Sequence, residues 1–239
     1  MKYYHVLIVL MFINCSKSEI KSLESKQIIA KSIQKHDPKK QWETTSFKVH
    51  IQEPRNKNPH RYSIVDLNNK TGHFELQRNR EAFISKHIID ENGNAKTFLD
   101  HKIVVDTLMI QKYRLNPKIN VRYKRFYQLL LGLPMSLQSE KVIIKDKIEP
   151  TLYNKKEVYK INIELKEPLF SKYWNLYFSQ EDYMLLGVEM MFPDNPKKGE
   201  RLFFDGIIKI DEILVPRMRH WYNMEDVYTG SDIILTEIK

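Results

Sequence analysis

The most constraining feature of this sequence is a two-residue alternation of apolar and polar side chains that recurs along much of the chain. Phe47, Val49 and Ile51 are separated by polar residues, and Ile161 and Ile163 repeat the pattern far downstream. Successive side chains of a β-strand point to opposite faces, so this period predicts strands with one buried face. The alternation therefore predicts a mainly β protein (α+β) whose sheet has an apolar face to cover.

Turn-forming residues separate the predicted strands, as at Asn68-Asn69-Lys70 and Asn92-Gly93-Asn94. Short strands that follow one another with such turns predict an antiparallel meander. Several later strands, including 201–210, carry apolar residues on both faces and are expected to be covered on both sides. The expected strands are 47–52, 61–67, 71–78, 82–89, 95–101, 159–165, 173–178, 184–192, 200–210, 213–222 and 232–238.

A short amphipathic helix is predicted near the start of the chain, over residues 27–35. Ile29 and Ile33 lie four residues apart, which is helical spacing, and Ser25 is a suitable N-cap residue. We expect the helix to end at His36-Asp37-Pro38, because proline disfavours a helical conformation of the residue before it.

Helices are also predicted in the middle of the chain. Asn116-Pro117 has the residue types of an N-cap and a first helical position, and Gly132 terminates a run of helically spaced apolar residues that ends at Leu131. Residues 106–115 predict a further helix, although Ile103-Val104-Val105 before it could equally form a strand. These helices interrupt the sheet.

The amino terminus has the composition of a secretory signal. Lys2 precedes an unbroken apolar run, Val6–Ile13. A helix over residues 3–14 would span roughly 18 Å at about 1.5 Å per residue, which is short of the roughly 30 Å of a bilayer core. We therefore interpret residues 1–14 as a signal peptide and not as a membrane span.

The segment 10–15 resembles the bacterial lipoprotein signal, which is cut before a cysteine that then carries acyl chains. Cys15 is the only cysteine, so it has no partner for an internal disulfide. The alternatives are a soluble periplasmic protein cleaved elsewhere, or a buried thiol. The lipoprotein interpretation predicts a lipidated, flexible tether over 15–26 and one domain over 27–239.

The charge of the chain is positive. The formal net charge is +9, and removal of residues 1–14 takes away only Lys2, which leaves +8. A basic surface suits anionic partners such as phospholipid headgroups or nucleic acid. Export argues against nucleic acid, so we expect the membrane as the partner, through the lipid on Cys15.

Motifs of catalysis are missing from the sequence. There is no Gly-x-Ser-x-Gly elbow, His-Glu-x-x-His pair or phosphate-binding loop, so we predict neither an enzyme nor a cofactor. One set of residues could be imagined as a metal site, but its spacing fits no defined site, and we expect its members to be solvated at strand ends. These residues are His87, Asp90, His101 and Asp106.

Two further polar groups have both a functional and a structural interpretation. His36-Asp37 could be an acid–base pair, but Asp before Pro is more typical of a turn. Arg217, Arg219 and His220 could bind a headgroup or phosphate. We expect them instead to form an exposed strand face with cations over aromatic rings.

Several short segments, in their order along the chain, resemble a family of Gram-negative lipoproteins of unassigned function. More distantly they resemble the periplasmic Lol-type lipoprotein carriers and their outer membrane receptors. The resemblance implies a half-open antiparallel β-barrel of about 10–11 strands, with a short N-terminal helix and mid-chain helices packed across its concave face. The segments are 36–38 with Trp42, 123–135, 174–178 with Gly187, 205–207, and Val215-Pro216.

The implied hollow suggests a ligand site made of apolar side chains. Met adapts to irregular apolar ligands, although the same residues could simply fill the core. The ligand residues predicted for this hollow are Phe126, Leu130, Trp174, Phe178, Met190, Phe204 and Trp221.

Two main functions remain open at the level of sequence, with a hydrolase as a distant third. One is an anchored envelope lipoprotein, expected at the outer membrane, whose hollow holds a lipid or other apolar ligand. The other is a structural or interaction lipoprotein whose filled barrel docks on an envelope protein complex.

Overall fold

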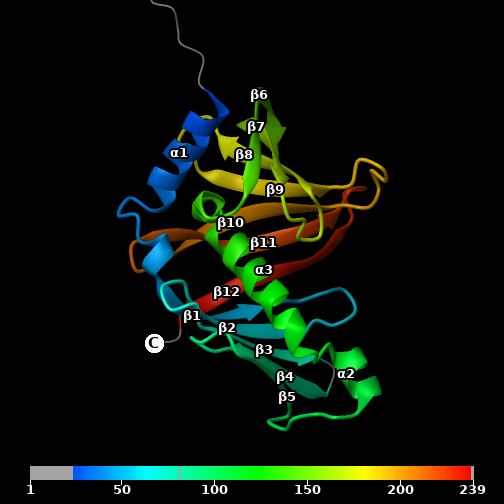
Figure 1. Ribbon diagram of the computed structural model, residues 1–239. Helices are drawn as coiled ribbons and strands as arrows, with labels where there is room; N and C mark the ends of the chain where they lie inside the picture. The colour runs from blue at the N-terminus through cyan, green and yellow to red at the C-terminus, as the bar shows by residue number, and fades with distance from the viewer. Residues whose placement is uncertain (1–23, 81, 238–239) are drawn as a thin grey trace, which may run out of the picture.

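The computed structural model describes residues 24–80 and 82–237, and it arranges them as a twelve-stranded antiparallel sheet with helices on one face (Figure 1). The predicted signal peptide, Cys15 and the tether as far as residue 23 lie outside the described residues. The strands are β1 (Ser46–Gln52), β2 (Tyr62–Asn68), β3 (Phe74–Arg80), β4 (Phe83–Ile89), β5 (Ala95–Leu99), β6 (Val142–Tyr153), β7 (Lys156–Leu165), β8 (Tyr173–Ser179), β9 (Leu185–Met191), β10 (Glu200–Ile210), β11 (Ile213–Asn223) and β12 (Tyr228–Glu237).

The sheet order is β5-β4-β3-β2-β1-β12-β11-β10-β9-β8-β7-β6, so the first and last strands pair at its centre. The sheet is open, with β5 and β6 at its two edges. Because these edge strands are consecutive in the sequence, the chain between them must cross the whole face of the sheet. The mainly β fold with an open, half-barrel sheet is the one the sequence predicted.

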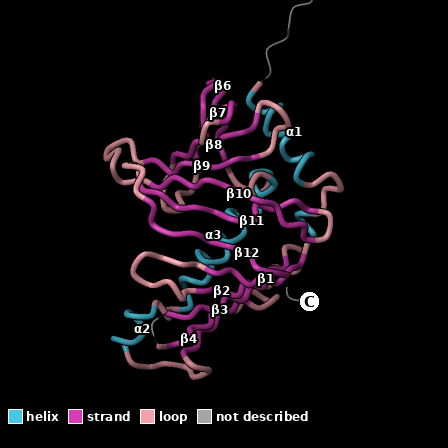
Figure 2. The backbone as a smooth tube through the Cα atoms, turned by 180° about the vertical axis from the view of Figure 1, so that it is seen from behind, coloured by secondary structure: helices cyan, strands magenta, loops and turns pink. Residues whose placement is uncertain are grey.

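The crossing connection contains the mid-chain helices. The helical elements are α1 (Ser25–His36), η1 (Trp42–Thr44), α2 (Thr107–Tyr113), η2 (Pro117–Ile119), α3 (Asn120–Gly132) and η3 (Met135–Gln138). Helix α3 lies diagonally over the sheet in Figure 1, and in the view from behind the strands lie in front of it (Figure 2). It contacts β2, β3, β4 and β11, whereas α1 contacts β6 and β11.

The space between helices and sheet is filled by two apolar clusters. One joins α1 and the second half of α3 to β7–β11, with Trp174 and Phe178 fully buried. The other joins Tyr127 and Leu131 of α3 to β1–β4 and the ends of β10–β12. Burial on this scale stabilises by roughly 25 cal/mol per Å² of apolar surface, which holds the helices on the sheet.

Helix α1 begins earlier than expected and has a different cap. Glu24 is the N-cap: its side chain and that of Gln27 form a reciprocal capping box. Ser25, predicted as the N-cap, instead donates a 3.0 Å hydrogen bond to the carbonyl of Asp146 in β6. The predicted end is confirmed: Asp37 accepts hydrogen bonds from the backbone N–H groups of Gln41 and Trp42.

The predicted mid-chain helices are confirmed with one change. Asp106 caps α2 by accepting from the N–H of Met109 at 2.8 Å. Asn116 and Pro117 start a separate short turn, η2, and α3 begins only at Asn120. Within the described residues, no helix is both long and apolar enough to span a bilayer.

Strand β6 was not predicted. Only Val142 to Ile144 are apolar before the polar run Lys145-Asp146-Lys147, and the pairing with β7 shifts register between Ile144 and Ile148. An edge strand with a bulge and charged side chains has no regular alternation of apolar and polar residues. The bulge and the charges keep such an edge from pairing with other chains. It raises the number of strands above the 10–11 expected.

The expectation that strands are covered on both faces holds for β8 and for the first half of β10, and fails for the second half of β10. In β8, Trp174 points to the helices, while Asn175 and Tyr177 on the other face are 2% and 5% exposed. In β10, Phe203 packs on the outer face with Tyr153 and Tyr177, whereas Ile207, beyond Gly206, is 46% exposed. The double cover therefore extends from β8 and β9 onto the first half of β10 and ends before Gly206.

Candidate functional site

The inner face of the sheet changes from apolar to charged along its strands. The alternation that buries Phe47, Val49 and Ile51 continues to Glu53, so a carboxylate occupies the next inward position. In β3 the inward positions that begin with Phe74 and Leu76 end with Arg78 and Arg80 in the same way. Antiparallel pairing brings these ends together, and β2 adds Arg61 and Ser63 at its start.

A cavity of about 590 Å³ lies at this charged end, between the sheet and the first half of α3. Its volume is in the range of small-molecule sites, about 300–1,000 Å³. Five arginines and three carboxylates line it, so its walls carry more positive than negative charge. The lining residues are Glu53, Arg55, Arg61, Arg78, Arg114, Ile119, Arg122, Tyr123, Phe126, Tyr127, Phe170, Glu200, Trp221, Thr229 and Asp232.

Glu53 is the centre of one buried polar network. Its Oε1 accepts a 2.7 Å hydrogen bond from Ser63 and lies 3.2 Å from the Tyr127 hydroxyl. Its Oε2 pairs with Arg80 at 2.8 Å and with Arg61 at 3.5 Å. Burial acts to raise the pKa of Glu53, but the charges of Arg80, Arg78 and Arg61 and the hydrogen bond from Ser63 hold it below its ordinary value. Glu53 is therefore an ionised, fully engaged carboxylate.

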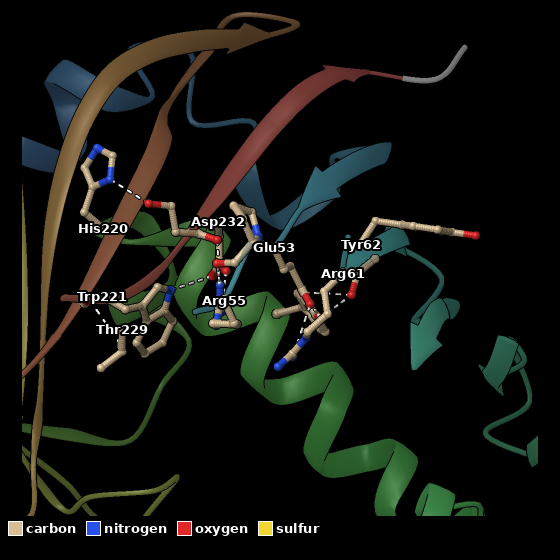
Figure 3. Close-up of polar contacts among 12 residues, drawn as sticks. Glu53, Arg55, Arg61, Tyr62, His220, Trp221, Thr229 and Asp232 are labelled. Carbon is tan, nitrogen blue, oxygen red and sulfur yellow. Dashed lines mark hydrogen bonds and ion pairs between the residues drawn. The ribbon is translucent and has the colours of Figure 1, made fainter. Parts of the chain in front are cut away.

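Asp232 is the centre of a second network (Figure 3). Its Oδ1 pairs with Arg55 at 2.7 Å, and its Oδ2 accepts a 2.8 Å hydrogen bond from the indole of Trp221. Arg55 also donates to the carbonyl of Ser231 at 2.6 Å and lies over the Trp221 ring, 5.9 Å from its centre. These contacts join the loop after β1 to β11 and β12, and they use both oxygens of Asp232.

Three arginines of the cavity have no ion pair with a described carboxylate. Arg78 lies over the ring of Tyr123 at 5.0 Å, and Arg122 lies over Phe170 at 5.6 Å. Arg114 follows α2 in a left-handed conformation and is exposed. Because Glu53 and Asp232 are already engaged, these cations leave the cavity with positive charge that it does not neutralise itself.

Arg219 is a further cation of the inner face, directly opposite Asp232 in the β11–β12 register. It is 1% exposed, and none of its guanidinium nitrogens has a hydrogen-bond acceptor among the described residues. Its guanidinium lies over the ring of Phe204, 5.9 Å from the ring centre. Burial lowers its pKa to about 10. The prediction of an exposed cationic face is therefore right for the exposed Arg217 and wrong for Arg219.

The imagined metal ligands are dispersed. His87 is 1% exposed and not solvated as expected: its Nδ1 lies 3.0 Å from Asn120 Oδ1, and its ring packs edge-on against Tyr123. Asp90 accepts hydrogen bonds from its own turn, and His101 and Asp106 are exposed. No group of three or more His, Cys, Asp or Glu side chains that could hold a metal occurs in the part of the chain that the structure describes.

The His36-Asp37 pair is buried and structural. His36 Nδ1 lies 2.7 Å from the carbonyl of Leu214, and its Nε2 accepts a hydrogen bond from the N–H of Leu185. Burial lowers the pKa of His36, so its imidazole is neutral and pins α1 to β9 and β11. The predicted turn role of this pair is confirmed, with His36 as an additional packing contact.

The predicted apolar ligand residues are only partly brought together. Leu130, Trp174, Phe178 and Met190 are at most 4% exposed and pack with α1 in the larger apolar cluster. Phe126 and Trp221 line the 590 Å³ cavity. Phe204 packs against the cluster, contacts Arg219 and borders a different hollow of about 710 Å³ near the β8–β9 turn.

That second hollow is chemically different. Four acidic side chains and one lysine line it, and it faces the turn connecting β8 to β9. Among the described residues, its lining includes no arginine and a single aromatic ring, so the cavity beside α3 is the better candidate site. The acidic residues are Glu157, Glu181, Asp182 and Asp205.

The arginines that line the cavity were missed by the sequence analysis, although a signal was present. Arg78 occupies a strand position where the alternation calls for an inward apolar side chain, and so does Arg219, which the sequence analysis named but expected to be exposed. A charged residue at such a position is exceptional because its burial is costly, so it marks a functional or paired site.

Comparisons with known proteins agree with this fold. The chain resembles a domain from Vibrio parahaemolyticus that is assigned by name to outer membrane lipoprotein sorting, with a TM-score of 0.52 and 9% identity over 90% of this chain and 92% of that one. It also resembles a LolA superfamily protein from Nitrosomonas europaea, with a TM-score of 0.51 and 8% identity over 91% and 93% of the two chains. These likenesses confirm the predicted Lol-type fold.

At the level of sequence, a comparison with curated proteins gives no match. A family model described as a family of unknown function (DUF6503) matches residues 2–231, which is nearly the whole chain. The protein therefore belongs to the DUF6503 family.

Proposed function

We propose that this protein is a non-catalytic lipoprotein of the cell envelope that is anchored by Cys15 and binds a lipid or other apolar ligand on the concave face of its sheet. The observation that carries the proposal is the 590 Å³ cavity between α3 and the sheet, with Phe126, Phe170 and Trp221 in its walls. The fold shared with a domain named for lipoprotein sorting supports it.

The cavity is a better ligand site than the full set of apolar residues expected from sequence. Trp174 and Phe178 are 1% and 0% exposed beneath α1 and α3, so a ligand would reach them only if a helix moved. Phe126 and Trp221 need no such movement. The ligand therefore enters beside the first half of α3.

The binding test uses protein purified from the envelope with its lipid anchor removed. Native mass spectrometry should detect a co-purified lipid, and the emptied protein should take up a fluorescent fatty acid. Ile119→Trp places a large ring in the cavity wall and should block uptake. Val121→Trp adds the same ring at a position that is 64% exposed and outside the cavity lining, and it should not. Absence of both lipid and uptake in the wild-type protein would refute ligand binding.

The anchor is tested separately. Cys15→Ser should release the protein from the membrane fraction, which we expect to be the outer membrane, while circular dichroism of the domain stays unchanged. A variant that remains membrane-bound after signal cleavage would contradict the anchor, and would leave the ligand proposal to be judged on its own test.

A second candidate function is docking on an envelope protein. It is favoured by exposed apolar side chains on the connection between β5 and α2 and on the first turn of α2, where Ile103, Val105 and Leu108 are 73%, 88% and 75% exposed. Clustered exposed apolar residues are typical of protein–protein contacts. Crosslinking in cells should then trap one defined partner, and Leu108→Glu should abolish the adduct. A chain that remains monomeric throughout would count against docking.

A further inference from the structure

The positive charge of the cavity is not neutralised by the carboxylates in its own lining. Its carboxylates Glu53 and Asp232 are each engaged at both oxygens, by Arg61, Arg80 and Ser63 in one case and by Arg55 and Trp221 in the other. Glu200 is the third carboxylate, and it lies exposed at the rim. Arg78, Arg114 and Arg122 therefore have no carboxylate partner in the described chain.

Buried hydrogen-bond donors without acceptors also indicate that positive charge near the cavity is not compensated. Nε of Arg61 and Nε of Arg78 are both buried, and neither has an acceptor among the described residues. Arg219 lies behind the cavity lining, opposite Asp232 in the strand register. Its three guanidinium nitrogens are also buried without an acceptor among the described residues. A buried cation without a partner is costly, and an anion nearby reduces that cost.

Aromatic rings hold two of the arginines in place. Tyr123 and Phe170 lie against the guanidinium groups of Arg78 and Arg122. A ring on one face of a guanidinium leaves its N–H groups directed outward in the guanidinium plane, which is the geometry that binds two oxygens of a phosphate or carboxylate. The side chains that would recognise an anion are thus preorganised by the fold.

We propose that the cavity binds the anionic group of an amphipathic ligand, a phosphate or a carboxylate, between Arg78, Arg114 and Arg122, with the apolar part of the ligand against Phe126, Phe170 and Trp221. This inference deepens the proposed function and rests on it, because it adds a charge to a ligand that the proposed function describes only as a lipid or apolar molecule.

The test is titration calorimetry on the full-length Cys15→Ser chain, purified without detergent, with four probes. Dodecyl phosphate and dodecanoate carry an anionic group on an apolar chain, dodecanol carries the chain alone, and inorganic phosphate carries the anion alone. Both anionic amphiphiles should bind at least tenfold more tightly than dodecanol. They should also bind more tightly than phosphate, which distinguishes a lipid headgroup from a free anion.

Variants at the rim identify the residues. Arg114→Gln with Arg122→Gln should weaken dodecyl phosphate binding at least about tenfold, because charge-assisted hydrogen bonds are lost, and should not weaken dodecanol binding. Both positions are exposed, so the fold should tolerate the change. Lys118→Gln removes a positive charge from the neighbouring turn, outside the cavity lining, and should have no effect beyond twofold.

The outcomes separate the two proposals. If dodecanol binds as tightly as dodecyl phosphate, or if the arginine variants bind like wild type, the anionic inference is wrong while the proposed function stands. If none of the four probes binds, both are wrong. If phosphate binds as tightly as dodecyl phosphate, the anion site is supported, and the proposal that it serves a lipid is contradicted.

Discussion

Replacement of His87 by asparagine should remove a large part of the acid sensitivity of this fold. His87 is 1% exposed beneath Tyr123, and its Nδ1 faces Asn120 Oδ1. The amide of Asn120 is oriented by donating to the carbonyls of Ile88 and Lys96, so His87 Nδ1 must carry the proton. Nε2 is then unprotonated and buried, with no described partner. Protonation would place a charged N–H where nothing accepts it.

The magnitude follows from the pKa. Burial, together with the charges of Arg78 and Arg80, lowers the pKa of His87 to about 4 in the folded protein. The unfolded value is near 6.5, so the unfolded chain binds the proton more tightly and stability falls as the pH falls below 6.5. The difference of about 2.5 between these pKa values corresponds to roughly 3 kcal/mol in full, and to about 2 kcal/mol between pH 7 and pH 5.

The assay is urea unfolding of wild type and His87→Asn at pH 7, 6 and 5. Asparagine keeps a donor for Asn120 and does not titrate in this range, so the variant should lose about 2 kcal/mol less than wild type between pH 7 and pH 5. His60→Asn is the matched control, since that side chain is exposed, and it should follow wild type. Parallel pH profiles for wild type and His87→Asn would refute a buried neutral imidazole.

Substitutions at four further positions test the packing and the charges. Gly132→Ala should cost about 1–3 kcal/mol in urea unfolding, because a Cβ would lie 2.1 Å from the Trp42 ring; an unchanged midpoint would contradict this close approach. Arg219→Met should raise the free energy of unfolding by about 1–4 kcal/mol by removing an unpaired buried cation, whereas Arg55→Met should lower it by breaking the pair with Asp232; a destabilised Arg219→Met would mean that the guanidinium has a partner. Asp37→Ala should lower the free energy of unfolding by about 1–3 kcal/mol, measured by thermal unfolding, because the N–H groups of Gln41 and Trp42 lose their acceptor. The stability of Asp37→Asn should lie between that of Asp37→Ala and that of wild type.

Local signals in the sequence were enough to predict most of the fold. Strands β1 to β5 and the end of α1 at Asp37 follow from alternation, turn residues and proline chemistry, which act over a few residues. Strand β6 was missed because its polar edge carries no alternation. The pairing of β1 with β12 brings together strands that lie far apart in the sequence, and no local sequence pattern encodes it.

The candidate site could be predicted only in part for the same reason. Phe126 and Trp221 were expected to bind ligand from their residue types and from the resemblance. Arg55 and Asp232 meet only because β1 and β12 pair, across 177 residues of sequence. Arg78 could be detected from the sequence as a charged residue at an inward strand position. It lacks an ion pair with a carboxylate because Glu53 pairs with Arg61 and Arg80, and only the packed structure determines this pairing.

The cavity remains open because its walls are charged, and this restricts what can fill it. The second half of α3 presents Leu129 and Leu130, which close against the sheet and gain free energy from apolar burial. The first half places Arg122 and Tyr123 in the same cavity wall as Arg78, and closure there would remove water from like charges without supplying an acceptor. An apolar molecule alone would face the same cost, since it would displace water from these guanidinium groups and return no hydrogen bond. A hollow maintained by unpaired cations is therefore best filled by a ligand that brings an anion with its apolar chain.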